Sequence, residues 1–131
     1  MNTRTTETVF ATVAPQFIVA DVVKTAEYYR DVFGFEITDY FLDPPVHCIV
    51  TRARSQLFLG KSAGTIEVSN RSLTPTGIDA YFRVQGLDSL ANQVDANGGM
   101  ILERCVTRSY DVRELVVQDC NGFVIVFGED V

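Results

Sequence analysis

Tryptophan is absent from this chain of 131 residues, histidine occurs once, and the three cysteines lie far apart. No Cys-x-x-Cys pair supports a disulfide framework or a zinc cluster, so we expect Cys48, Cys105 and Cys120 to be reduced, small apolar core residues. No hydrophobic run approaches the length of a membrane-spanning helix. The N-terminal stretch lacks the basic-then-apolar order of a secretion signal, which favours a cytoplasmic location.

Positive charge is also scarce, with 11 Lys and Arg against 17 Asp and Glu, for a formal net charge of −6. The basic residues form no cluster, and an acidic surface repels phosphate backbones, so we expect no nucleic-acid partner. A negative field favours cationic small molecules instead. Hydrophobic residues make up 47% and charged residues 21%, which is typical of one globular domain spanning residues 1–131.

Residues 15–34 form the first part of a unit that occurs twice in the chain. An apolar, β-branched run predicts a strand that ends at Asp21, whose carboxylate is a good helix N-cap. Gly34 supplies the left-handed stop of the following helix. Between them, the apolar positions recur at helical spacing: Val22, Ala26, Tyr29 and Phe33.

The second half of the chain repeats this order, because Val19 and Val84, like Gly34 and Gly99, lie 65 residues apart. Three strand-like runs follow each predicted helix: 35–41, 47–52 and 56–59 in the first half, and 100–107, 113–118 and 123–127 in the second. The polar segment 61–76 is interpreted as a linker. The sequence therefore predicts an α+β fold of two tandem βαβββ modules, about 11–60 and 77–129, each with one helix behind a small sheet.

Three motifs follow one another along the chain. The first motif combines Val19-Ala20-Asp21 with the later stretch AEYYRDVFGF (26–35) and is close to "VxD…A..FYrdvLGF". The second motif, VQGLD (84–88), is close to "V.GLDeL". The third, RELVVQDCNG (113–122), is close to "REFxxxDPDG". In this order they resemble the glyoxalase/bleomycin resistance protein/dioxygenase (vicinal oxygen chelate) superfamily, closest to its metal-free bleomycin-resistance branch. The resemblance covers residues 13–129 and implies curved, cup-like mixed sheets whose inward residues bind or act.

The resemblance also locates the four positions from which metal-dependent members take their ligands. Here they fall on Ala14, Phe58, Asp79 and Val126, and only the aspartate has a donor atom. A catalytic divalent metal needs about three protein ligands, so the resemblance implies no metal, no other cofactor and no catalytic residue. His47 falls on none of these positions, and we interpret it as a surface or sheet-edge residue.

Period-two alternation then assigns side chains to faces. On the last strand, Val124 and Val126 point into the cup and Phe127 into the core, and Phe82 and Val84 also belong to the core. An apolar cup with a few polar groups suits an organic ligand, on which rim aromatics stack. The predicted ligand-binding residues are Gln16, Phe35, Tyr40, Phe58, Asp79, Tyr81, Arg83 and Tyr110. Asp79 and Arg83 could equally well pair with each other or with a neighbouring strand. Arg113 and Glu114 are interpreted as a charge pair, and residues 119–122 as a tight turn.

The leading hypothesis is a non-catalytic, drug-sequestering protein of the bleomycin-resistance type that binds a small cationic or aromatic molecule. The resemblance implies a homodimer in which the partner completes each pocket, and Thr5–Val13 could serve as an exchanged strand. Relatives carry Trp-Gly where this chain has Tyr110-Asp111-Val112, so bleomycin itself is not implied. The alternative is a metal-dependent glyoxalase-like lyase, isomerase or dioxygenase, and a third hypothesis is a metal-free catalyst that uses Asp79 or Tyr81 as acid or base.

Overall fold

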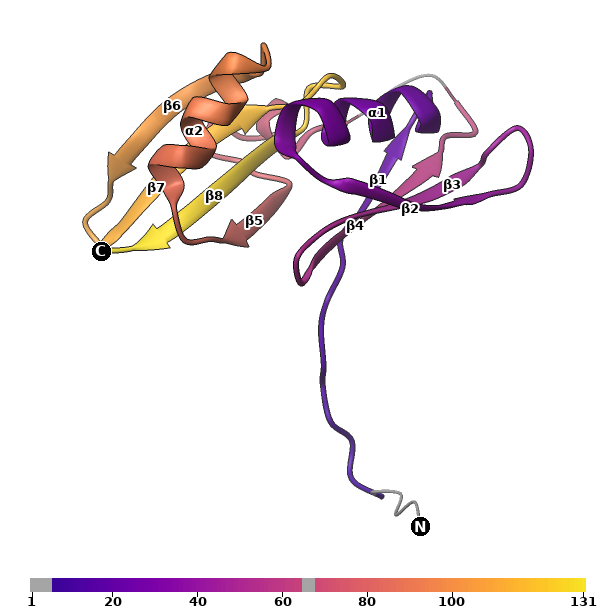
Figure 1. The fold of residues 1–131 in the computed structure, drawn as a ribbon, viewed down its shortest axis with the longest axis horizontal. Coiled ribbons are helices and arrows are strands. Elements are labelled where there is room, and N and C mark those ends of the chain that lie inside the picture. Colours follow the sequence, from indigo (N-terminus) through magenta and orange to yellow (C-terminus); the bar gives the residue numbers. More distant parts are fainter. Residues whose placement is uncertain (1–5, 65–67) are drawn as a thin grey trace.

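Two four-stranded mixed sheets with a helix each make up the body of the protein in the computed structural model, which describes residues 6–64 and 68–131 (Figure 1). The first module contains β1 (Gln16–Val19), α1 (Val22–Phe33), β2 (Glu36–Phe41), β3 (His47–Arg52) and β4 (Ser55–Lys61). A short 3-10 helix, η1 (Asn70–Ser72), precedes the second module. This contains β5 (Ala80–Arg83), α2 (Leu87–Ala96), β6 (Met100–Thr107), β7 (Val112–Gln118) and β8 (Val124–Asp130).

The two modules share one topology, which confirms the predicted α+β fold of two βαβββ units. The strand orders are β1-β4-β3-β2 and β5-β8-β7-β6. In each sheet the first and last strands of the module pair in parallel, and the other neighbours are antiparallel. The buried faces of α1 and α2 belong to one core cluster on the same side of the sheets, so the opposite side carries neither of these helices (Figure 1). We call that opposite side the open face.

The first helix begins and ends where the sequence predicts. Asp21 accepts a hydrogen bond from the backbone N–H of Lys24 at 3.0 Å, and Gly34 adopts a φ of 74° while its N–H bonds to the carbonyl of Tyr29. These contacts satisfy backbone groups that have no partner within the helix itself. The second helix ends at Ala96, just before Gly98, which has a φ of 78°.

The main core lies between the helices and the sheets. Tyr29 and Phe33 of α1 meet edge to face at 5.1 Å, and Phe82 stacks on Phe127 at 5.5 Å. A separate buried cluster on the open face of the second sheet consists of Val116, Val124 and Val126. The split between the two clusters confirms the period-two face assignment of the last strand, because Phe127 and Val126 point to opposite faces.

The cysteines follow the sequence expectation only in part. All three are free, as predicted, but only Cys48 is buried. Cys105 is partly exposed and Cys120 is exposed, so the expectation that all three are core residues is wrong. Cys120 lies in the turn between β7 and β8, outside the strands that form the core.

Gly99 marks a close approach between the two helices. A Cβ atom at this position would lie 2.5 Å from Cγ1 of Val94 and 2.7 Å from Cγ1 of Val32. We therefore expect Gly99→Ala to lower the free energy of unfolding by about 1–3 kcal/mol, as overpacking of a close-packed core does. Urea unfolding checks this, with Gly64→Ala as the control because a Cβ at Gly64 meets nothing within 4 Å. Equal stability of the two variants would contradict the close approach.

The segment before β1 extends away from the body (Figure 1). Its apolar side chains are almost fully exposed, at 76% for Val9, 95% for Phe10 and 90% for Val13. Exposed apolar side chains in such a row commonly mark a contact surface. In the part of the chain that the structure describes, no helix is long and apolar enough to cross a membrane.

Candidate functional site on the open face

The open face of the first sheet presents an apolar and aromatic surface. Gln16 pairs with Phe58, Ile18 with Gly60, and His47 also with Gly60, so these positions share one face. His47 meets the ring of Phe58 edge to face at 5.6 Å. Ile18 remains 45% exposed, and this is a large fraction for a branched apolar side chain in a strand. The surface can therefore stack on or cover an organic molecule.

A cavity of about 400 Å³ lies beside this surface, between β1 and the start of the second module. It is lined by Pro15, Gln16, Phe17, Ile18, Val68, Asn70, Asp79 and Phe123. Its volume is within the range of small-molecule sites. We refer to it as the open-face cavity.

The carboxylate of Asp79 in this cavity is occupied by hydrogen bonds from the protein itself. One oxygen accepts from the Ser69 hydroxyl at 2.9 Å and from the backbone N–H of Val124 at 2.8 Å. The other accepts from the backbone N–H of Asn70 at 2.9 Å. Asp79 therefore ties the segment between β4 and β5, which we call the inter-module segment, to β8. The sequence left open whether Asp79 pairs with Arg83 or with a neighbouring strand, and the structure shows the neighbouring strand.

The floor of the second sheet is already covered within one chain. Val116, Val124 and Val126 are at most 3% exposed, and Ile78 packs against them. The inter-module segment is also anchored nearby, since Arg71 Nε donates to the carbonyl of Gly77 at 3.0 Å. Val124 and Val126, which alternation assigns to the cup, do face it, but these three valines offer little free surface to a ligand.

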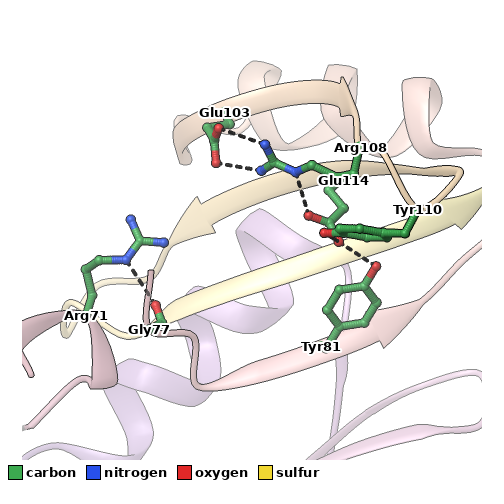
Figure 2. A network of polar contacts seen from close by, with 7 residues as sticks. All are labelled: Arg71, Gly77, Tyr81, Glu103, Arg108, Tyr110 and Glu114. Atoms are coloured by element: carbon green, nitrogen blue, oxygen red, sulfur yellow. Dashed lines mark hydrogen bonds and ion pairs between the residues drawn. The ribbon is translucent and has the colours of Figure 1, made fainter. Parts of the chain in front are cut away.

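Beyond the valines, the open face carries a polar network centred on Glu114, shown in Figure 2. The hydroxyls of Tyr81 and Tyr110 donate to the same Glu114 oxygen at 2.8 and 2.9 Å. Arg108 Nε donates to the other oxygen at 2.9 Å, and its Nη2 donates to Glu103 at 2.8 Å. Glu114 is 5% exposed, so its charge is compensated by the guanidinium and two phenols rather than by water.

This arrangement sets the ionisation of its members. Burial raises the pKa of Glu114, but the hydrogen bonds from Arg108, Tyr81 and Tyr110 outweigh burial and hold the pKa below the usual value of 4.5. Burial and the adjacent carboxylate raise the pKa of Tyr81 to about 12. At neutral pH the network therefore consists of a carboxylate that accepts and phenols that remain protonated and donate.

Gly128 makes room for the ring of Tyr81. A Cβ at Gly128 would lie 2.6 Å from Cζ of that ring. We therefore expect Gly128→Ala to turn Tyr81 away from Glu114 and to lower the free energy of unfolding by about 1 kcal/mol, the value of one hydrogen bond. Urea unfolding in a Tyr81→Ala background is the control. The cost of Gly128→Ala should nearly vanish there, and an unchanged cost would show that the ring is not its cause.

Two of the aromatic residues predicted at the rim lie elsewhere. Tyr40 pairs with Cys48, which is fully buried on the helix side, because an irregularity between Ile37 and Asp39 shifts the register of β2. The residue that shares the open face with His47 is instead Phe41, which is 58% exposed. Phe35 is buried in the main core against Tyr29 and Phe82. Neither Tyr40 nor Phe35 is thus placed on the open face.

The structure also decides three expectations about charged residues and His47. Arg83 bonds to Asp130 on the neighbouring strand β8 at 2.7 Å and lies 5.2 Å from the centre of the Tyr81 ring, so it pairs with a neighbouring strand rather than with Asp79. Arg113 and Glu114 do not pair with each other, because neighbouring residues of a strand point to opposite faces. Arg113 instead bonds to Asp88 at 2.7 Å. His47 lies on β3, an inner strand of the first sheet, and is partly exposed on the open face, so of the surface and sheet-edge alternatives the surface one is observed.

The structure thus brings Gln16 and Phe58 together on the first sheet, and Tyr81 and Tyr110 around Glu114 on the second. The central role of Glu114 was missed although Arg108 and Tyr110 lie only six and four residues before it, because its third partner, Tyr81, lies 33 residues before it on another strand. A signal did exist, since Glu114 stands two residues before Val116 and four after Tyr110. Val116 is the strand partner of Val126, so the two side chains share a face. Because alternate residues of a strand point to the same face, Glu114 lies on that face too, which is the open face.

Metal-dependent members of the superfamily that the sequence resembles take their ligands from four positions, and the residues at these positions in this chain do not form a divalent-metal site. Ala14, Phe58 and Val126 have no donor atom, and both oxygens of Asp79 already accept hydrogen bonds from Ser69, Asn70 and Val124. Among the residues that the structure describes, no group of three or more His, Cys, Asp or Glu could hold a metal ion. The donor set does not fit such a metal.

Comparison with solved structures identifies the fold. A glyoxalase-related enzyme from Clostridium phytofermentans is similar, with a TM-score of 0.77 and 18% identity over 97% of this chain and 100% of that one. The chain has the glyoxalase fold. TioX from Micromonospora sp. ML1 gives a TM-score of 0.74 at 15% identity, over 93% of this chain and 100% of TioX. No protein-family model and no curated protein matches the sequence.

Proposed function

We propose that this protein binds a small organic molecule on its open face without catalysing a reaction, in the manner of the bleomycin-resistance proteins. The observation that carries this proposal is the donor set at the metal positions, where three side chains cannot coordinate and Asp79 has a structural role. The metal-dependent alternative requires ligands that these positions do not supply.

The surface available to the ligand supports binding by burial and stacking. Ile18, Phe58 and His47 lie together on the first sheet beside the open-face cavity. The side chain of Tyr110 is 61% exposed, and its hydroxyl is held by Glu114. Its ring is therefore oriented for stacking, which contributes about 0.5–1.5 kcal/mol per aromatic pair. We infer an aromatic ligand, and the acidic chain favours a cationic one.

A thermal-shift screen of cationic aromatic drugs and neutral aromatic metabolites tests the proposal. A compound present at 100 times its dissociation constant should stabilise the fold by about 2.7 kcal/mol. For a neutral aromatic compound, Ile18→Asp should abolish this stabilisation, because the ligand would have to desolvate a carboxylate on the apolar surface and offers it no compensating charge. Tyr40→Asp is the matched control on the other face and should bind as the wild type does. A binder that responds to Tyr40→Asp but not to Ile18→Asp would contradict the site.

We also propose that the protein is a homodimer in which the arm before β1 contacts the partner chain. The arm exposes Val9, Phe10 and Val13, and burial of these side chains would contribute about 1.5–3 kcal/mol each. Of the Thr5–Val13 segment considered from the sequence, Thr5 lies outside the described residues. Analytical ultracentrifugation should give a dimer for the full chain and a larger monomer fraction for Phe10→Asp. A monomeric wild type at micromolar concentration would contradict the dimer.

A further inference from the structure

Two Asn-Gly steps occur in the chain, Asn97-Gly98 and Asn121-Gly122. This dipeptide is especially prone to lose ammonia spontaneously, because glycine has no side chain to hinder attack by its own backbone nitrogen on the preceding side-chain amide. Both steps lie outside helices and strands, the first directly after α2 and the second in the turn between β7 and β8. The structure places them in very different surroundings.

The first step is exposed and loosely held. Both Asn97 and Gly98 are exposed, and among residues 6–64 and 68–131 the side chain of Asn97 has no hydrogen-bond or ion-pair partner. One hydrogen bond holds the nitrogen that would attack, since the N–H of Gly98 donates to the carbonyl of Asp95 at 3.2 Å. Helix ends fray, so this bond opens readily.

The rotation that the reaction requires is open to this segment. Asn97 has a ψ of 10°, and rotation about this bond must bring the nitrogen of Gly98 onto Cγ of Asn97. Gly98 can compensate for the rotation, because glycine adopts backbone angles that other residues avoid. Its surroundings leave room, since a Cβ placed on Gly98 would meet nothing within 4 Å.

Asn121 has the same neighbour but is held on several sides. Its Nδ2 donates to the hydroxyl of Thr25 at 2.9 Å, and its backbone N–H donates to a carboxylate oxygen of Asp119 at 2.9 Å. The N–H of Gly122 donates to the carbonyl of Asp119 at 3.2 Å. Asp119 is itself buried and bonded to Tyr29 of α1. Attack at Asn121 therefore requires several of these bonds to break together.

We propose that Asn97 is a site of spontaneous deamidation, and that the fold protects Asn121 from the same reaction. The backbone nitrogen of Gly98 attacks Cγ of Asn97, which forms a cyclic succinimide and breaks the Cγ–Nδ2 bond. The side-chain nitrogen leaves as ammonia and takes the proton of the Gly98 N–H. Water then opens the ring at either carbonyl, which gives aspartate or isoaspartate and returns a proton to the nitrogen of Gly98.

Either product changes the end of α2. A carboxylate at position 97 adds negative charge at the helix C-terminus, where the helix dipole is already negative. Isoaspartate also adds one carbon to the main chain, two residues before Gly99. Gly99 lies close to Val94 and Val32, since a Cβ here would be 2.5 and 2.7 Å from their Cγ1 atoms. Deamidation should therefore loosen the contact between α2 and α1.

Peptide mapping of the full chain after incubation at mildly alkaline pH tests the proposal. Trypsin places the two sites in separate peptides, 84–104 and 114–131, and fragmentation in the mass spectrometer assigns the aspartate and isoaspartate forms. In the folded protein Asn97 should convert at least about tenfold faster than Asn121, because opening the turn breaks several hydrogen bonds rather than one. In the urea-unfolded chain the two rates should be similar. Equal rates in the folded protein, or the same ratio after unfolding, would overturn the proposal.

Variants separate the site from its surroundings. Asn97→Gln should remove most acidic charge variants of the aged protein in isoelectric focusing, whereas Asn92→Gln, within α2, should leave them unchanged. Thr25→Val removes the acceptor of Asn121 Nδ2 and should speed conversion at Asn121 but not at Asn97. Charge variants that persist in Asn97→Gln would contradict the assigned site.

Urea unfolding measures the effect on α2. The aged wild type should unfold at a lower urea concentration than the fresh protein, and aged Asn97→Gln should unfold as its fresh counterpart does. This comparison uses no ligand and is therefore independent of the proposed binding activity. An aged wild type that is deamidated at Asn97 and yet as stable as the fresh protein would contradict the loosened contact.

Discussion

Replacing Asp119 by alanine should lower the free energy of unfolding by roughly 3–5 kcal/mol, because three buried donors lose their acceptor together. Asp119 is 6% exposed. One oxygen accepts from the hydroxyl of Tyr29 at 2.6 Å, and the other accepts from the backbone N–H groups of Asn121 and Phe123 at 2.9 Å each. The side chain therefore joins α1 to the turn that starts β8, across 90 residues of sequence.

Urea unfolding at pH 7 measures this effect, and two variants separate its causes. Tyr29→Phe removes only one donor and should cost about 1 kcal/mol. Asp95→Ala removes an exposed carboxylate that lies 3.7 Å from Arg104 and should change stability by less than about 0.5 kcal/mol. If Asp119→Ala were as stable as Asp95→Ala, the hydrogen bonds to the turn would not be holding the modules together.

The second large effect is expected at Glu114. Glu114→Gln removes the charge that Arg108, Tyr81 and Tyr110 share, and we expect a loss of about 2 kcal/mol in the free energy of unfolding at pH 7. Arg108 would keep Glu103 at 2.8 Å, so the loss should be smaller than that of Asp119→Ala. Glu36→Gln, at an exposed position of β2, is the control.

The pH dependence of this loss has a defined sign. Because the pKa of Glu114 in the folded protein lies below its usual value of 4.5, the folded state binds the proton less readily than the unfolded chain does. The contribution of Glu114 is therefore fully present above about pH 4.5 and is lost as the pH falls through the lower, folded pKa. The stability difference between wild type and Glu114→Gln should shrink across this range, whereas a difference that grows at acid pH would contradict the network.

Much of the fold could be predicted because the signals that specify it are local. The cap at Asp21, the left-handed residue at Gly34 and the alternation in β8 depend on neighbouring residues, and each has the predicted role in the structure. The repeat then extended these local signals to the second module. The structure bears out this repeat, because β1 and β5 occupy equivalent places in their sheets.

The site was harder to predict because it depends on contacts between distant strands and on irregular backbone. The irregularity in β2 places Phe41 instead of Tyr40 on the open face, and a period-two pattern cannot show where a bulge occurs. The inter-module segment was expected to be a simple linker, yet its Ser69 and Asn70 donate hydrogen bonds to the carboxylate of Asp79. The alternation rule itself held at Tyr81, which reaches Glu114 on β7.

Ligand affinity with and without metal tests the central proposal, a metal-free binding surface, most directly. A compound found in the thermal-shift screen would be titrated into protein treated with a chelator, and into the same protein after addition of one equivalent of Zn²⁺, Ni²⁺ or Mn²⁺. We expect the same dissociation constant in every case, because Ala14, Phe58 and Val126 offer no donor and Asp79 is already bonded within the protein. Binding that occurs only with metal, and is lost in Asp79→Ala, would contradict the proposed function.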